Sequence, residues 1–88
     1  MYILVRFSDG SNPWYCINPT KKQALKHGYY FRKKYGEKAV IFFGRAGTDK
    51  ELTHDADGVW FVRYDNKAKI YKRLGDALNF LLKEDPHA

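Results

Sequence analysis

The sequence predicts an α+β fold: one small domain with a mainly antiparallel sheet of about five strands packed by two helices. Short stretches rich in β-branched and aromatic residues are separated by turn-forming clusters, which is typical of antiparallel strands. Two longer segments carry apolar residues at spacings of three and four, which is typical of amphipathic helices. The predicted order is β-β-α-β-β-β-α, and the 88 residues are assigned to one domain, 1–88.

The composition is that of a folded protein whose core depends on large side chains. A domain of this length buries only about 60–65% of its unfolded surface. Aromatic residues make up 17% of the chain, and each buries roughly 150–250 Å² when it is in a core. Hydrophobic residues at 44% and charged residues at 30% exclude disorder of the whole chain.

Residues 2–7 and 14–17 are predicted to form the first two strands. Residues 2–7 alternate, so that Val5 lies on one face of the strand and Arg6 on the other. Residues 8–13 combine Ser, Asp, Gly, Asn and Pro, which favour turns, and we expect them to close a hairpin.

Residues 20–35 are predicted to form the longest helix. Thr20 or Asn18 can cap its free N–H groups, and Gly36 suits the left-handed conformation that often ends a helix. Gly28 costs about 1 kcal/mol relative to alanine inside a helix. We expect close approach to the sheet to explain this glycine, with a kink as the alternative.

The second half of the chain is predicted to hold three strands and a helix. Residues 39–43, AVIFF, are apolar without alternation, which predicts a central strand with both faces at least partly covered. A long loop is expected over residues 44–58. Two further strands are expected over residues 59–64 and 68–72. Residues 74–82 carry a regular stripe of leucine and alanine that predicts the second helix.

Both helices are expected on one face of the sheet, although the apolar run at residues 39–43 leaves a helix on each face as an alternative. Residues 84–88 are expected to be a frayed polar tail. The core is expected to contain large side chains from the apolar stripe of each element, namely Phe31, Phe42, Trp60 and Leu78.

A weak internal similarity relates the two ends of the chain. Residues 5–8, VRFS, and residues 62–65, VRYD, each precede a turn, a strand containing tyrosine and a helix containing Ala-Leu. Self-similarity can mark a duplicated unit. Because the match needs a gap, two ordinary hairpin–helix units explain it as well.

The positive charge is concentrated in the first helix and its exit. The chain has 16 basic and 10 acidic residues, a net charge of +6, and residues 20–38 hold seven basic residues and one acid. Lysines that neutralise phosphates beside tyrosines that stack on bases are typical of nucleic-acid binding, and a solvated helix face is the alternative. The predicted contacts on the outer side of this helix are Lys22, Lys26, Tyr29, Tyr30, Lys33 and Lys34.

A second predicted contact surface is the sheet face opposite the helices. Alternation places Arg6 and Arg63 on that face, and Lys69 with Tyr71 is expected there together with Tyr15. Such a face can stack RNA bases. The glycine-aromatic run of RNA-recognition domains is missing, however, and cross-strand packing pairs would give the same pattern.

No motif predicts catalysis, a cofactor or a metal site. The chain lacks HExxH, P-loop, GxSxG and C-x-x-C patterns, so we expect a non-enzymatic protein without a cofactor. His54 and Asp55 are neighbours on a loop, where such residues rarely form an acid–base pair. Asp55 and Asp57 resemble a calcium loop only superficially, because its twelfth position would be Tyr64. The single Cys16 excludes an intrachain disulfide and is expected to be a buried, unreactive thiol.

These observations predict a small basic binding module for DNA or RNA. The alternative is a protein–protein module: a bacterial or viral accessory or inhibitor protein that docks on an acidic protein surface, or a homodimer. No stretch approaches the ~18–20 apolar residues that span a bilayer. The N-terminal residues lack a signal-peptide pattern. The expected location is the cytoplasm of a bacterium or of a virus-infected host cell, as a monomer or homodimer without a membrane partner.

Overall fold

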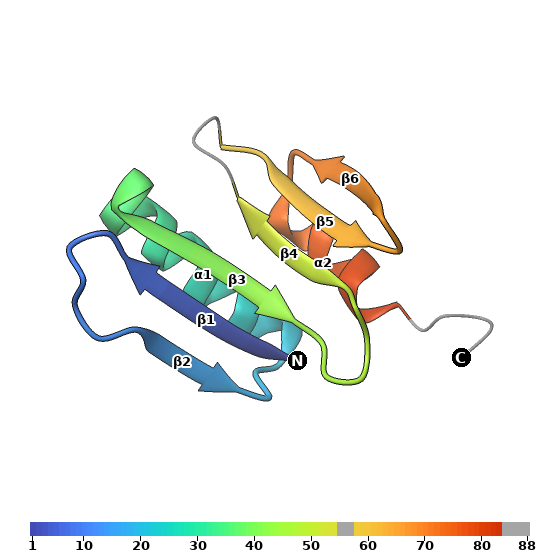
Figure 1. Cartoon of the computed structure of the whole chain (residues 1–88), viewed down its shortest axis with the longest axis horizontal. Coiled ribbons are helices and arrows are strands. Elements are labelled where there is room, and N and C mark those ends of the chain that lie inside the picture. The colour runs from blue at the N-terminus through green and yellow to red at the C-terminus, as the bar shows by residue number, and fades with distance from the viewer. Residues whose placement is uncertain (55–57, 84–88) are drawn as a thin grey trace.

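The computed structural model describes residues 1–54 and 58–83 and contains six strands and two helices. All neighbouring strands are antiparallel, in the order β2-β1-β3-β4-β5-β6 (Figure 1). The predicted α+β class is confirmed, with one strand more than expected. The elements are β1 (Tyr2–Phe7), β2 (Trp14–Ile17), α1 (Lys21–Tyr35), the 3-10 turn η1 (Gly36–Lys38), β3 (Ala39–Gly44), β4 (Glu51–His54), β5 (Trp60–Tyr64), β6 (Lys67–Tyr71) and α2 (Leu74–Leu82).

The additional strand, β4, lies inside the segment that was expected to be a loop. It has four residues and only Leu52 is buried, so its sequence carries too little apolar alternation to stand out. β4 pairs with β3 on one side and with β5 on the other. Beyond the last β3–β4 backbone pair, the Ile41 N–H donates to His54 Nε2 at 3.3 Å, so a side chain continues the ladder.

Both helices cover the same face of the sheet, as expected (Figure 1). α1 packs on β3, and α2 packs on β4, β5 and β6. The buried side chains between the helices and the sheet are Ile3, Val5, Ala24, Phe31, Ala39, Ile41, Phe43, Leu52, Trp60, Val62, Leu74, Ala77, Leu78 and Leu81.

The expectation that both faces of β3 are covered is wrong. β3 is central in the sheet, between β1 and β4, but its residues alternate between the helix side and an uncovered side. Phe43 is buried under the helices, whereas Phe42 is only partly buried and lies on the uncovered side with Val40. The expected burial of Phe31, Trp60 and Leu78 is confirmed, and that of Phe42 is wrong.

Local contacts explain where α1 begins and ends. The Gln23 N–H donates to Thr20 Oγ1 at 3.1 Å, and the Thr20 N–H donates to Gln23 Oε1 at 2.9 Å, which together form a capping box. Gly36 follows the helix with φ 56°, a value that favours glycine. A β-carbon on Gly28 would lie 2.5 Å from Leu74 Cδ2 and 3.1 Å from Phe43 Cζ, so close packing explains this glycine.

The strand arrangement is the same when it is followed inward from either edge of the sheet. From one edge the order is β2-β1-β3, and from the other it is β6-β5-β4. Each edge hairpin is followed by a helix on the same face. The similar runs noted above occupy matching places, since Val5 and Val62 are buried and Arg6 and Arg63 are exposed on the uncovered side. The fold is thus two hairpin–helix units, each completed by an inner strand.

Candidate nucleic-acid interface

One side of α1 carries all six contact residues predicted for this helix, and all six are exposed. The opposite side of the helix is buried against the sheet through Ala24, Gly28 and Phe31. The exposed side is called the lysine face from here on. Its residues are Lys22, Lys26, Tyr29, Tyr30, Lys33 and Lys34.

The Lys34 side chain is held in place by two aromatic residues. Its Nζ donates a hydrogen bond to the Tyr30 hydroxyl at 3.1 Å. The same atom lies 5.4 Å from the centre of the Tyr30 ring and 5.5 Å from that of Tyr35, within cation–π range. The hydrogen bond to the Tyr30 hydroxyl raises the pKa of the Lys34 ammonium above its usual value.

No carboxylate of the described residues forms an ion pair or hydrogen bond with a lysine of the lysine face. In residues 1–54 and 58–83, the bond from Lys34 to Tyr30 is the only polar side-chain contact of a lysine of this face. Asp49 accepts from the backbone of the β5–β6 turn, and Glu51 stands opposite Arg63 on the sheet. The other two acids of the β4–β5 connection, at positions 55 and 57, fall outside the described residues.

An aromatic hollow opens beside the lysine face, between α1 and the β1–β2 loop. Its volume is about 560 Å³. The Trp14 ring centre lies 4.8 Å from that of Phe31 and 4.9 Å from that of His27. Phe7 lies 5.0 Å from Tyr35 in the same way. The lining residues are Phe7, Asn12, Pro13, Trp14, Lys26, His27, Tyr30, Phe31 and Tyr35.

Sequence reasoning missed this hollow because its walls come from three separate elements. Phe7 ends β1, Trp14 begins β2, and Tyr35 ends α1. No local motif links these positions. The only signal in the sequence is the high aromatic content, which was assigned to the core.

The uncovered side of the sheet, here called the open face, is largely apolar. A row of directly opposed residues crosses all six strands: Tyr15, Leu4, Phe42, Thr53, Phe61 and Ile70. Ile17 is 71% exposed, Ile70 69% and Tyr15 60%. Contiguous exposed apolar surface of this kind often marks an interaction site.

Two of the three basic residues predicted on the open face lie there. The Arg6 guanidinium carbon stands 5.9 Å from the Phe42 ring centre, and that of Arg63 stands 5.6 Å from the Phe61 ring centre. Each arginine therefore covers an aromatic ring of the face. The flat guanidinium and the ring present a mixed basic and aromatic surface.

The prediction that Lys69 and Tyr71 lie on the open face is wrong. Lys69 stands opposite Val62, which points toward the helices, so Lys69 lies on the helix side. Its Nζ is 5.2 Å from the ring centre of Phe80 in α2 and 5.6 Å from that of Tyr71. The lysine covers an aromatic ring at the margin of the core with its long side chain, which leaves the apolar Ile70 on the outside.

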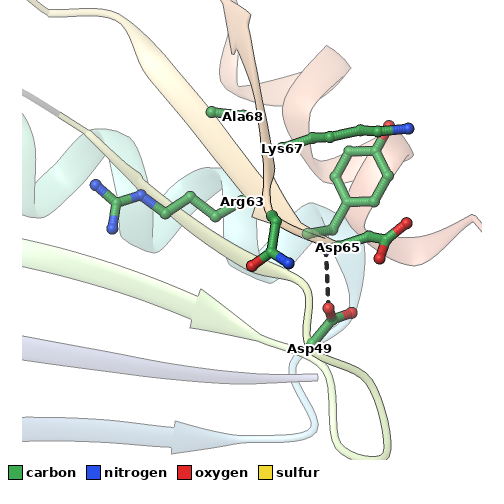
Figure 2. A pocket seen from close by; sticks show the side chains of 7 residues that line it. Asp49, Arg63, Asp65, Lys67 and Ala68 are labelled. Carbon is green, nitrogen blue, oxygen red and sulfur yellow. Dashed lines mark hydrogen bonds between the residues drawn. The ribbon is translucent and has the colours of Figure 1, made fainter.

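A polar hollow of about 430 Å³ lies where the β3–β4 loop meets the β5–β6 turn. Its main interaction is a hydrogen bond of 2.9 Å from the Asp65 N–H to Asp49 Oδ2 (Figure 2). Asp65 and Asn66 have φ of 48° and 58°, the left-handed pair that a two-residue hairpin turn requires. Figure 2 shows the Arg63 side chain directed away from Asp49. The hydrogen bond thus stabilises the turn, and the hollow is lined by both acidic and basic side chains.

Metal-ligating side chains form no cluster in the described part of the chain. No group of three His, Cys, Asp or Glu side chains is placed to hold a metal ion there. Asp55 and Asp57, whose resemblance to a calcium loop is only superficial, fall outside the described residues. Cys16 is partly buried opposite Ile3, and His54 packs against Trp60 with ring centres 5.3 Å apart. No described helix is long and apolar enough to cross a membrane.

Three surfaces therefore stand out: the lysine face, the aromatic hollow beside it, and the open face on the far side of the sheet. The first two share Lys26 and Tyr30 and form one continuous region of α1. The open face is separated from them by the whole thickness of the sheet (Figure 1). No family model, curated protein or solved structure matches this chain, so its function is inferred from these surfaces.

Proposed function

We propose that this protein is a non-enzymatic nucleic-acid-binding module that contacts phosphates through the lysine face. One observation carries the proposal: four lysines, in the segment that holds the net charge of the chain, project from one side of α1, and no described carboxylate pairs with them. A lysine-rich face that served only for solubility would gain nothing from collecting the charge in one place.

The arrangement suits contact with a phosphate backbone. Lys22, Lys26, Tyr30 and Lys34 follow one another at intervals of four residues, so they form a line that spans about 18 Å of helix. Lysine ammonium groups act as mobile point charges, which fit phosphates at varied spacing. Such contacts position a protein on a strand without reading its sequence. The expected affinity is that of non-specific binding, a Kd of about 10⁻⁴–10⁻⁶ M at physiological salt.

The salt dependence of binding tests the proposal. Each phosphate contact should contribute about −0.9 to the slope of log K against log salt for duplex DNA, or about −0.7 for a single strand. Four lysine contacts then give roughly −3 to −4 for a duplex. The measurement is fluorescence anisotropy with labelled single- and double-stranded oligonucleotides between ~50 and ~200 mM salt.

A matched pair of variants identifies the surface. Lys26→Gln with Lys33→Gln should flatten the duplex slope by about two contacts. Lys67→Gln with Lys72→Gln removes the same charge from exposed positions near β6 and should leave most of the slope. Equal losses in the two double variants would assign the effect to net charge alone. A parent protein that is folded but binds no oligonucleotide at tens of micromolar and ~50 mM salt would refute nucleic-acid binding.

A second candidate function, protein–protein contact, is favoured by the open face. Its most exposed large residues include two isoleucines, Ile17 and Ile70, which suit a protein surface better than a nucleic acid. Glu51 stands directly opposite Arg63 there, so the face offers both charges and can complement itself. We propose a second copy of this chain as the occupant, because a self-complementary patch suits a twofold dimer.

The size of the open face sets the expected strength of that dimer. Six strands about 4.8 Å apart, with about five residues of about 3.3 Å each, make a face of roughly 24 by 17 Å, or about 400 Å². Stable interfaces bury about 800 Å² on each partner. We therefore expect a weak dimer that forms only at high protein concentration.

A further inference from the structure

The aromatic hollow has the construction of a site for one flat aromatic group. Phe31 is buried and forms its base, while Trp14, His27, Tyr30 and Tyr35 surround it as partly exposed walls. The Trp14 and Phe31 rings lie 4.8 Å apart and tilted by 49°, and Phe31 and Tyr35 lie 5.9 Å apart and nearly parallel. The site is lined mainly by ring faces and edges, which offer stacking and few specific bonds.

Cationic and amide groups stand at the edge of the same hollow. Lys26 lines it directly, and Lys34 is held over the rings of Tyr30 and Tyr35. Asn12 of the β1–β2 loop adds an amide that can both donate and accept. A planar apolar group with a neighbouring negative charge would therefore find complementary partners, rings in the middle and ammonium groups at the rim.

A nucleobase with its phosphates has this combination, and only an unpaired base is free to enter. A base inside a duplex is stacked on both sides, and turning it out costs the stacking and pairing energy. Single strands expose their bases, and proteins that bind them combine a basic track with aromatic rings. Lys26 and Lys34 are about 12 Å apart along α1, on either side of the Tyr30 ring.

We propose that the aromatic hollow takes up one unstacked base of a single-stranded nucleic acid while Lys26 and Lys34 contact the adjacent phosphates. This inference rests on the proposed function and deepens it, since it names the strand state and the residues that distinguish a base from a bare backbone. Tyr30 has a double role, as a wall of the hollow and as the partner that holds Lys34.

Trp14 fluorescence provides a direct readout. Trp60, the other tryptophan, is 1% exposed and lies in the core, so a ligand in the hollow should quench Trp14 alone. The probes are two labelled single strands of about ten nucleotides with equal charge, one of thymidines and one of abasic sites, at ~50 mM salt. The thymidine strand should quench the fluorescence and bind roughly 5- to 150-fold more tightly than the abasic strand.

Two neighbouring tyrosines supply the matched variants. Tyr29 and Tyr30 are 50% and 48% exposed and lie side by side on the lysine face, but only Tyr30 lines the hollow. Tyr30→Leu should abolish most of the preference for thymidine over abasic strands and keep most of the salt slope. Tyr29→Leu should keep the preference for thymidine, because Tyr29 does not line the hollow. Circular dichroism and thermal melting show whether each variant is folded.

The possible results separate the two proposals. Equal affinity for thymidine and abasic strands with an intact salt slope would overturn the base site and leave phosphate binding by the lysine face in place. Tighter binding of a duplex than of the thymidine strand would also overturn it. A thymidine monophosphate that binds as tightly as the strand would mark the hollow as a free-nucleotide site instead. Absence of all binding would refute both proposals.

Discussion

The Leu74 side chain of α2 occupies the position next to Gly28 of α1 where a β-carbon would have to lie. That atom would be 2.5 Å from Leu74 Cδ2, which is closer than carbon atoms approach, so the buried Leu74 side chain or one of the helices would have to move. The contact fixes how near the two helices lie to each other on the sheet. It also reverses the usual effect of replacing a helical glycine.

Gly28→Ala is therefore expected to destabilise the fold, although alanine is the better helix former. Overpacking of this kind costs about 1–3 kcal/mol. Gly75→Ala in α2 is the control, because its β-carbon would meet Leu25 Cδ2 at an ordinary 3.8 Å. That variant should gain up to about 1 kcal/mol. Urea unfolding measures both, and stabilisation by both substitutions would contradict the packing seen here.

Neighbouring phenylalanines of β3 should respond differently to truncation. Phe43 is buried under the helices, so Phe43→Ala should cost about 3–5 kcal/mol of unfolding free energy. Phe42 is partly buried on the open face, and Phe42→Ala should cost roughly 1–2 kcal/mol. The two substitutions remove the same atoms at neighbouring positions, so each variant serves as the control for the other. Equal losses would place a covering layer on both faces of the sheet.

The helix cap offers a test of the start of α1. Thr20→Ala removes the acceptor of the Gln23 N–H and should cost about 0.5–2 kcal/mol. Thr20→Ser keeps a hydroxyl acceptor and should lose much less. Thermal unfolding followed by far-ultraviolet circular dichroism compares the three proteins. A Thr20→Ser protein as unstable as Thr20→Ala would show that the methyl group, and not the hydrogen bond, is responsible.

Self-association through the open face should depend on Ile70. Ile70→Lys puts a charge at the β6 end of the apolar row, where burial of an unpaired ammonium in a dimer interface is costly. Sedimentation equilibrium of the parent should show a weight-average mass that rises with concentration, and the variant should remain monomeric. Lys26→Gln on the helix side should dimerise like the parent. A parent that stays monomeric at millimolar concentration would exclude the second copy as occupant.

The ionisation of Lys34 should follow its tyrosine partner. Its pKa is raised in the folded protein by the Tyr30 hydroxyl and the neighbouring rings, so the folded state favours the charged form. Because the pKa is higher in the folded state, the ionised Lys34 contributes to stability below the unfolded lysine pKa of about 10.4. This stabilisation is lost as the pH rises through the higher folded pKa. Tyr30→Phe should lower the Lys34 pKa in an NMR titration. Tyr29→Phe should leave it unchanged.

Those features of the fold that depend on local contacts could be predicted from the sequence. The Thr20 cap and the end of α1 at Gly36 were each visible within a few residues. Phe31 and Trp60 lie on the apolar side of their own helix or strand, and that side must face the core. The placement of the lysine face follows in the same way, because helical spacing alone puts its members on the outside.

Features that depend on distant partners could not be predicted. The apolar run of β3 does not show which of Phe42 and Phe43 points to the helices, because that choice depends on which face α1 covers. Lys69 lies on the helix side because the register of the β5–β6 hairpin places it opposite Val62, which points toward the helices. The strand β4 was missed because its pairing partners, and not its own residues, keep it extended. The aromatic hollow exists only when Trp14 and Tyr35 are brought together by the fold.

The mirrored strand order has a consequence for how the chain can be divided. Every pair of neighbouring strands except β3–β4 joins strands of the same half of the chain, so within the sheet the halves are joined by one strand pairing, 42–44 with 51–53. Contacts between the two helices and side-chain contacts of Trp60 with Phe43 and Arg32 add to this pairing. A peptide bond broken in the β3–β4 loop would therefore cut no strand and no helix. The two fragments should recombine without a covalent link. The pairing of β3 with β4 would then report that the fragments have associated.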